Sequence, residues 1–183
     1  MTAPSGSDSD AALTQRAQGG DRTAFNAFVL HHQEPLYRFI RRYVGDGEEA
    51  YDLLQETFVS AWQALGRYDA TRPAATWLRR IALNKCRDWG RRRKVRRFFY
   101  GAVDIDAANP AALAVEPASD ESENLARLDQ AIASLPTQLK EPLILTALEG
   151  LSHQEAAIVL GVTAKAIETR VYRARRLLAE HLV

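Results

Sequence analysis

The sequence predicts an all-α protein made of two small helical domains that are joined by a flexible acidic linker. Apolar residues recur at helical spacing through both halves of the 183-residue chain, and no stretch of useful length alternates as a strand would. Between residues 98 and 126 there is no Lys or Arg, and alanine, proline and acidic residues are frequent. We therefore expect a disordered N-terminus (1–10), a first domain (11–100), the linker (101–121) and a second domain (122–183).

The composition is that of an ordinary globular protein rather than a strongly basic one. Hydrophobic residues make up 46% of the chain and the formal net charge is only +1, so any binding of nucleic acid has to come from local segregation of charge. The one cysteine, Cys86, allows neither an intramolecular disulfide nor a cysteine metal cluster. It lies in an apolar helical pattern, which predicts a buried structural thiol. We expect no cofactor and no metal.

No targeting signal is visible in the sequence. The first ten residues, MTAPSGSDSD, hold neither early cations nor an apolar run, so we expect no signal peptide. No stretch approaches the length that spans a bilayer, which predicts a cytoplasmic protein without membrane insertion.

Three helices are expected in the main part of the first domain. Asp21 can cap the first of them, and Pro35 within it predicts a kink or a break. The second follows Asp46, which has capping-box spacing to Glu49. The third begins near Pro73, since a first helical turn tolerates proline. The apolar stripes of these helices contain Phe25, Phe28, Val29, Leu36, Phe39, Ile40, Tyr43, Leu53, Leu54, Phe58, Ala61, Trp62, Leu65, Trp77, Leu78, Ile81 and Ala82.

The segment GLSHQEAAIVLGVTAKAIETRVYRARRLL predicts a helix-turn-helix. Ser152 and Glu155 form an S-x-x-E capping box for the first helix, Gly161 lies where a left-handed C-cap is needed, and Thr163 can cap the second helix. Such a second helix can enter the major groove of DNA. The alternative is a plain helical hairpin with solvated cations. The second helix buries Ile167, Val171, Ala174 and Leu178 and presents Lys165, Glu168, Thr169, Tyr172, Arg173 and Arg176.

The segment WLRRIALNKCRDWGRRRKVRRFFY is the densest cluster of cations in the chain. Cations bind phosphates and aromatic rings stack on unpaired bases, so this mixture suits DNA that has been opened. Against it stands the alternative of a basic surface with tryptophans in the core, which for Trp77 alone is favoured. The cluster holds Arg79, Arg80, Lys85, Arg87, Arg91, Arg92, Arg93, Lys94, Arg96 and Arg97 against one acid, Asp88, with Trp77, Trp89, Phe98, Phe99 and Tyr100 interleaved or adjacent.

The segment YDLLQETF has a different surface. Asp52, Gln55 and Glu56 lie on the exposed side of a helix that is otherwise apolar. A solvated face is one interpretation, and a face that binds protein is the other, because DNA would be repelled by it.

Taken together, these segments resemble the bacterial sigma factors of the extracytoplasmic-function (ECF) group over nearly the whole chain after the first ten residues. GDRTAFNAFVLHHQEPLYRFIRRYV resembles the opening helices of the family and DLLQETFVSAWQAL its polymerase-docking helix. WLRRIALNKCRDWGRRRK is similar to the segment that melts and reads the minus-ten element. LPTQLKEPLILTALEGLSHQEAAIVLGVTAKAIETRVYRARRLL resembles the domain that reads the minus-thirty-five element.

The resemblance implies a promoter-specificity subunit of RNA polymerase, which is not an enzyme, acting in a stress or envelope response. The implied partners are core RNA polymerase, through the clamp helices of its largest subunit and its flap, promoter DNA and an anti-sigma factor. The residues implied to face the clamp helices are Asp52, Gln55 and Glu56.

Roles toward DNA also follow from the resemblance. Asn84, with Trp77 nearby, is implied to hold an unstacked base of the minus-ten element, and the cations implied to bind backbone there are Arg80, Lys85, Arg87 and Arg91. In the minus-thirty-five element, an acid at Glu168 can accept from cytosine N4, whereas relatives often carry a cation at that position. The residues implied to lie at this element are Lys165, Glu168, Thr169, Arg170, Tyr172, Arg173 and Arg176.

Two other classes of function stay open on the sequence. A conventional helix-turn-helix regulator would use its N-terminal helices to sense a ligand or to dimerise, and it needs neither the basic-aromatic cluster nor the docking helix. A sigma-like decoy that only binds an anti-sigma factor should have lost its DNA-facing cations. No catalytic constellation surrounds the four histidines, and a sensing role for Cys86, His31 or His32 is not decided by the sequence.

The charge distribution predicts that the full-length protein binds free duplex promoter DNA only weakly. The net charge is near zero, and the acidic linker can compete with phosphate for the basic surfaces. Fluorescence anisotropy with labelled promoter duplexes tests this. Tight, sequence-specific binding without polymerase would instead favour the conventional regulator.

Overall fold

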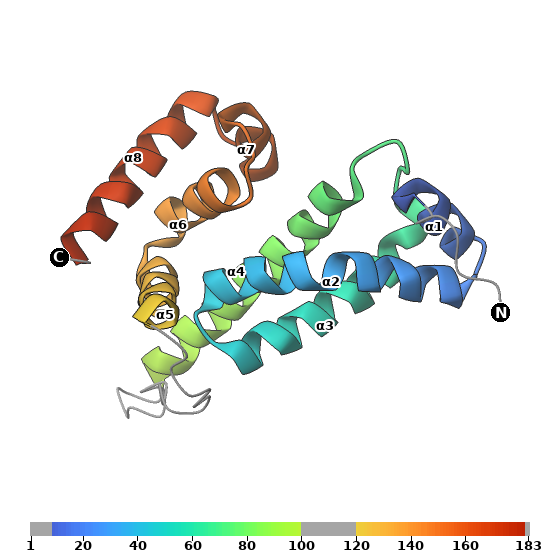
Figure 1. Ribbon diagram of the computed structural model, residues 1–183, viewed down its shortest axis with the longest axis horizontal. Helices are drawn as coiled ribbons and strands as arrows, with labels where there is room; N and C mark the ends of the chain where they lie inside the picture. Colours follow the sequence, from blue (N-terminus) through green and yellow to red (C-terminus); the bar gives the residue numbers. More distant parts are fainter. Residues whose placement is uncertain (1–8, 100–119, 182–183) are drawn as a thin grey trace.

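The computed structural model describes residues 9–99 and 120–181, and both ranges are helical, as the sequence predicts (Figure 1). The first range forms the N-terminal domain, with the elements α1 (Asp10–Gln18), α2 (Arg22–Val44), α3 (Gly47–Ala64), the short 3₁₀ helix η1 (Leu65–Arg67) and α4 (Ala74–Phe99). The second forms the C-terminal domain, with α5 (Asp120–Ser134), α6 (Thr137–Leu143), the π-helical turn η2 (Ile144–Leu148), α7 (His153–Leu160) and α8 (Ala164–His181).

Two predictions, of a flexible linker and of a disordered N-terminus, fall largely outside the described residues. These are the flexible linker at 101–121, of which only the last two residues are described, and the disordered N-terminus at 1–10. Ser9 and Asp10, which that N-terminus included, lie instead at the start of α1. The Ser9 side chain caps this helix by accepting a hydrogen bond from the Ala12 N–H at 3.3 Å.

The helix α2 is continuous through Pro35, so a break at that position is wrong. An internal proline removes one backbone hydrogen bond and costs about 3 kcal/mol. Burial on either side of it offsets this cost, because Phe28 precedes the proline and Phe39 and Ile40 follow it in the core. The N-cap is the predicted one, since the Asp21 carboxylate accepts from the Ala24 N–H at 3.0 Å.

Gly45 ends α2 in the left-handed conformation, with φ of 83°. A side chain would be strained there, and it would also meet the C-terminal domain, because an added Cβ would approach the Ala133 Cβ to 2.7 Å. The glycine therefore both terminates the helix and lets α5 pack close to it.

The core of the N-terminal domain lies between α2, α3 and α4. Leu53, Leu78 and Leu83 are fully buried in it, as is Cys86, so the predicted buried thiol is confirmed. Trp62, which was predicted to lie in the apolar stripe, is exposed over 37% of its surface. Its ring packs edge-on against Phe25, with ring centroids 4.8 Å apart.

The helix-turn-helix forms as predicted. Ser152 and Glu155 make a reciprocal capping box at the start of α7, and Gly161 ends that helix with φ of 67°. The Thr163 hydroxyl accepts from the Ala166 N–H at 3.2 Å at the start of α8. Buried Ile167 and its neighbours then hold α8 against α6 and α7, which leaves the polar side of α8 outward.

The two domains pack against each other rather than standing apart. The helix α5 lies beside the C-terminal end of α2, and the buried apolar residues of both domains form one continuous cluster (Figure 1). This contact carries the polar groups described below.

Ile167→Asp should unfold the C-terminal domain. The Ile167 side chain is fully buried, so the substitution places an unpaired charge in the apolar face, at a cost of about 4 kcal/mol or more. Ile158→Asp is the matched control, because Ile158 is 82% exposed on α7. Circular dichroism melts of both variants test the packing, and equal loss of helix in the two would contradict it.

Candidate nucleic-acid and polymerase interfaces

One face of α4 is open to solvent and carries part of the predicted minus-ten set. Arg80 and Asn84 are exposed one helical turn apart, and Trp77 lies on the same side, one turn earlier. Trp77 is half-buried and stacks on Tyr68, with ring centroids 4.3 Å apart and planes 29° from parallel. The structure thus brings the three together, and the Trp77 ring has a fixed orientation because Tyr68 covers one side of it.

Other cations of the predicted minus-ten set have carboxylate partners. Lys85 lies 3.5 Å from the Glu56 carboxylate, which also lies 4.0 Å from Arg92, so Glu56 links α3 to α4. Arg91 pairs with Asp88 one turn earlier on α4. These contacts are part-exposed and are worth little in stability, so a phosphate could replace each carboxylate at small cost.

Arg87 differs, because its partner belongs to the other domain and is buried. Its Nε and Nη2 donate to the two carboxylate oxygens of Glu141 at 2.7 and 2.6 Å. The Glu141 side chain is only 6% exposed. The Tyr43 hydroxyl donates to the same carboxylate at 3.0 Å. The hydrogen bond to Glu141 raises the pKa of Arg87, and burial followed by the Glu141 charge raises the pKa of Tyr43.

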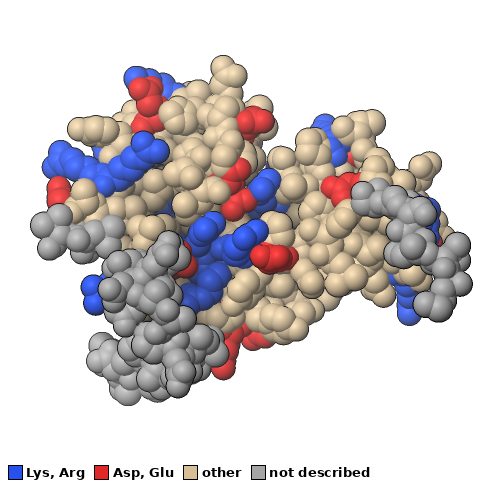
Figure 2. All heavy atoms as spheres, viewed as in Figure 1, with Lys and Arg blue, Asp and Glu red and all other residues tan. Residues whose placement is uncertain are grey.

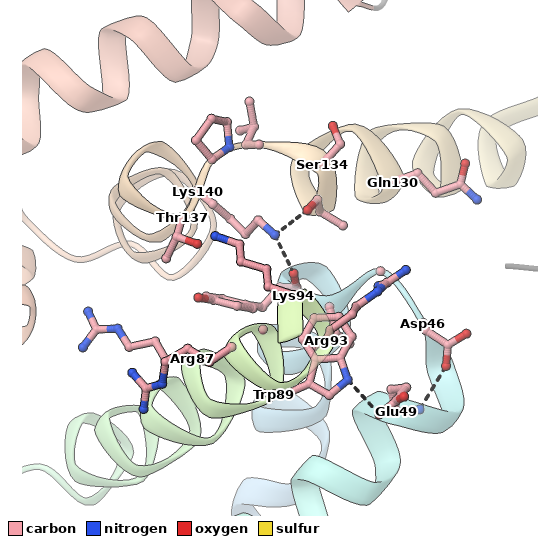
Figure 3. A pocket seen from close by; sticks show the side chains of 18 of the residues that line it. Asp46, Glu49, Arg87, Trp89, Arg93, Lys94, Gln130, Ser134, Thr137 and Lys140 are labelled. Carbon is pink, nitrogen blue, oxygen red and sulfur yellow. Dashed lines mark hydrogen bonds between the residues drawn. The ribbon is translucent and has the colours of Figure 1, made fainter. Parts of the chain in front are cut away.

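Lys140 lies beside this group in the cleft between the domains (Figure 3). Its Nζ donates to the backbone carbonyl of Tyr43 at 3.0 Å and to that of Ala133. Burial, together with the nearby charges of Arg93 and Lys94, lowers the pKa of Lys140 to about 8. Its ammonium ties the end of α2 to the end of α5 through these two backbone carbonyls.

A second ion pair joins the domains nearer the N-terminal end of α4. The Arg79 Nε donates to the Glu149 carboxylate at 2.6 Å, and the Glu149 side chain is 7% exposed. Sequence reasoning assigned no role to Lys140, Glu141 or Glu149, and it gave Tyr43 only a place in an apolar stripe. The available signal was the pair Lys140–Glu141 inside LPTQLKEPLILTAL, a segment that is otherwise mainly apolar.

The surface distribution of charge agrees with these contacts. In Figure 2 the Lys and Arg side chains gather where the two halves of the molecule meet and on the lobe formed by the C-terminal helices, with acidic side chains among them. The cleft at the meeting point has a volume of about 1100 Å³ and is lined from α4 by Arg91, Arg93, Lys94 and Arg96.

The predicted polymerase face on α3 is apolar as well as acidic. Asp52 and Gln55 are exposed, whereas Glu56 is partly covered by its cation partners on α4. Beside them runs a groove of about 620 Å³ between α2 and α3. Its apolar lining includes exposed Tyr51 and Val59, at four-residue spacing on either side of Gln55. That spacing was visible in the sequence, but only Asp52, Gln55 and Glu56 were singled out.

The exposed face of α8 holds the predicted minus-thirty-five set. Lys165 and Glu168 form an ion pair at 2.8 Å, which lowers the pKa of Glu168. Arg176 pairs with Glu180 at 3.3 Å. Tyr172 is 68% exposed, which leaves its ring available to a partner. The remaining members are on the same helix, with Thr169 and Arg173 exposed and Arg170 half-buried.

Two of the histidines lie close to the same carboxylate. Asp10 lies 3.0 Å from His32 Nε2 and 3.6 Å from His31 Nδ1. Within the described residues, no group of three or more His, Cys, Asp or Glu side chains could hold a metal ion.

The comparisons with known proteins agree with this geometry. The Sigma-70 region 2 family model matches residues 28–96, and the Sigma-70, region 4 family model matches residues 125–178. The chain is 41% identical over 177 residues to the RNA polymerase sigma factor NccH of Alcaligenes xylosoxydans xylosoxydans, a match that covers 96% of this chain and 94% of that protein. It is 31% identical over 179 residues to the ECF RNA polymerase sigma-E factor of Escherichia coli, covering 91% and 90%.

Solved structures are similar over the same length. The structure of CnrH in complex with the cytosolic domain of CnrY has a TM-score of 0.70 and 34% identity, and the match covers 96% of this chain and 97% of CnrH. The sigma factor RpoE in complex with the anti-sigma factor NepR from Bartonella quintana has a TM-score of 0.66 and 28% identity, covering 85% and 94%.

Two family regions in the predicted order, with relatives matched over nearly their whole length, show that the chain belongs to the ECF group of RNA polymerase sigma factors. The resemblance found in the sequence is confirmed. Among the described residues, no helix combines the length and apolar character needed to cross a membrane.

Charge reversal on α3 tests the docking face. Asp52→Lys together with Glu56→Lys should weaken binding to core RNA polymerase by about tenfold or more, since like charges then meet at the contact. Binding is measured by fluorescence anisotropy with labelled protein. Glu34→Lys is the control for a change of charge, because the Glu34 side chain is exposed on α2.

The outcome also depends on the fold of the variant, because Glu56 pairs with Lys85 and Arg92. Circular dichroism should show an unchanged helix content. Unchanged affinity in a folded double variant would remove the docking role from these residues.

Proposed function

We propose that the chain acts as a promoter-specificity subunit that binds core RNA polymerase, reads two promoter elements and helps to open DNA. The observation that carries this proposal is the separation of three surfaces on one chain. The exposed face of α4 is basic and polar, the face of α8 is polar with an exposed Tyr172, and the α2–α3 groove is apolar with acids at its side. As a subunit that binds and positions, it needs no catalytic group of its own.

On α4 we assign the minus-ten contact to the side that holds Trp77, Arg80 and Asn84. A ring fixed by stacking is a suitable wall for an unstacked base, and an exposed amide next to it can hydrogen-bond to a base edge. The backbone contacts are assigned to Lys85, Arg87 and Arg91. Of these, Arg87 can reach a phosphate only after it leaves Glu141.

On α8 we assign base contacts to the exposed residues Glu168, Thr169, Tyr172 and Arg173. Phosphate contacts are assigned to Arg170 and Arg176, with Lys165 at the helix start. The capped N-terminus of α8 and its buried apolar face support this, because a recognition helix has to be held rigidly on its partner helix.

The partners follow from the family. We propose that Asp52, Gln55 and the neighbouring groove bind the clamp helices of the polymerase, and that the C-terminal domain meets the flap. An anti-sigma factor is a further partner, since the similar structures include RpoE with the anti-sigma factor NepR. A protein that works with RNA polymerase acts in the cytoplasm.

In vitro transcription with core polymerase and a library of randomised minus-thirty-five sequences tests the function. The wild type should select a defined sequence, and transcription that does not depend on this chain would overturn the proposal.

Glu168→Lys should change which sequence is selected, with effects of about 1–3 kcal/mol per altered base pair. Arg176→Ala is the matched comparison, because loss of a phosphate contact should weaken all promoters alike and reduce the salt dependence. If Glu168→Lys selects the same sequences as the wild type, α8 does not read bases through that position.

A further inference from the structure

The side chain of Gln18, the last residue of α1, contacts the segment that precedes α4. Its Nε2 donates to the backbone carbonyl of Leu65 at 2.9 Å and to that of Tyr68 at 2.8 Å. Tyr68 is the C-cap of η1, where a helix has no further N–H group to offer a carbonyl. Both donors of one amide are therefore used to hold a short helix that lies about fifty residues later in the chain.

Tyr68 connects this contact to Trp77. Its N–H donates to the Leu65 carbonyl at 3.0 Å, and its hydroxyl donates to the backbone carbonyl of Arg72 at 2.5 Å. With the contact from Gln18, the backbone and the ring of Tyr68 are both fixed. The ring is stacked on that of Trp77, with centroids 4.3 Å apart, so the place of Tyr68 decides which side-chain rotamer Trp77 can adopt.

The position of Gln18 is itself fixed by the packing of α1. Leu13 and Ala17 are each 3% exposed, which anchors the helix on the N-terminal domain. Just after Gln18 the chain turns, and the turn is held by an ion pair of 2.8 Å between Arg16 and Asp21, the N-cap of α2. The Gln18 residue is exposed, so its side chain adds nothing to the core and can be replaced without disturbing it.

We propose that Gln18 is a positioning residue for the minus-ten contact, acting through Tyr68 on Trp77. The proposal rests on the proposed function, which gives Trp77 and Asn84 the unstacked base. Hydrogen bonds depend steeply on distance and angle. A changed rotamer of Trp77 would therefore alter how a stacked base meets the Asn84 amide. The helix α1 then helps to decide which base is accepted, although it does not touch the base.

Two substitutions of Gln18 separate the hydrogen bonds from the shape of the side chain. Gln18→Glu has nearly the same shape, but a carboxylate donates to neither carbonyl. Gln18→Lys restores donors, since an ammonium can join two backbone carbonyls, as Lys140 does in this protein. Gln15→Glu and Gln15→Lys are the matched controls of charge, because Gln15 is exposed on the same helix.

Nuclear magnetic resonance of the full chain with ¹⁵N-labelled tryptophan tests the link to Trp77. The chain has three tryptophans, and Trp77→Phe identifies the indole signal of Trp77. Gln18→Glu should shift this signal, and Gln18→Lys should return it toward the wild-type position. The Trp89 signal is the internal reference, because its indole donates to Glu49 at 2.8 Å and should not move. An unchanged Trp77 signal in folded Gln18→Glu overturns the proposal.

Transcription with core polymerase tests the effect on base choice, with libraries randomised in the minus-ten or in the minus-thirty-five element. Gln18→Glu should change the preference at one minus-ten position by about two- to tenfold, the range that one hydrogen bond allows. Gln18→Lys should restore the wild-type preference. Selection in the minus-thirty-five element should stay as in the wild type, and both Gln15 variants should leave both selections unchanged. Equal weakening of all promoters by Gln18→Glu would show a merely structural role and overturn the proposal.

Failure of this inference and failure of the proposed function are distinguishable. If the wild-type protein directs transcription while Gln18→Glu selects the same minus-ten sequences, only the positioning role is wrong. If the wild-type protein directs no transcription with core polymerase, the proposed function is wrong, and the positioning role in base choice is wrong with it even where the Trp77 signal moves.

Discussion

The burial of the Glu141 carboxylate is the constraint on which the arrangement of the two domains depends. A carboxylate that is 6% exposed loses most of its hydration and has to be compensated by partners with good geometry. Arg87 and Tyr43 supply three hydrogen bonds, and both come from the N-terminal domain. If the domains separate, the carboxylate and Arg87 both regain water, so the ion pair itself adds little net stability even though the pairing is specific.

This balance suits a protein that has to change partners. The ion pairs at the contact can be exchanged, because a phosphate offers Arg87 much the same geometry as a carboxylate does. Lys140 adds to the specificity of the docked form without adding much stability, since burial has already lowered its pKa to about 8.

Local structure could be predicted from the sequence because its signals are local. Asp21, Ser152, Gly161 and Thr163 act at helix ends as expected, and most of the stripe residues that the apolar spacing predicted for α2, α3, α4 and α8 are buried, whereas the buried residues of α1 and α6 were not named. The continuity of α2 through Pro35 could not be predicted, since it depends on packing that the proline does not reveal. The contact between the domains was equally out of reach, because Arg87 and Glu141 are 54 positions apart and each looks like a surface charge when taken alone.

The candidate sites also contain residues that the sequence could predict and residues that it could not. Arg80 and Asn84 on α4 and the exposed residues of α8 follow from helical spacing, so the sequence could name them. The apolar groove beside Gln55 was missed, because an exposed Tyr51 or Val59 cannot be distinguished from a core residue without the neighbouring helix. The contact of α4 with the C-terminal domain, through Arg79 and Arg87, becomes visible only in three dimensions.

The most direct test of the central claim is the distance between the two domains in the working complex. Energy transfer between labels on η1 and α8 can be measured in the free chain, with core polymerase, and with polymerase and promoter DNA. The account predicts a short distance in the free chain and a clearly longer one once promoter DNA is bound, when Arg87 has left Glu141. A distance that stays short in a complex active in transcription would contradict it.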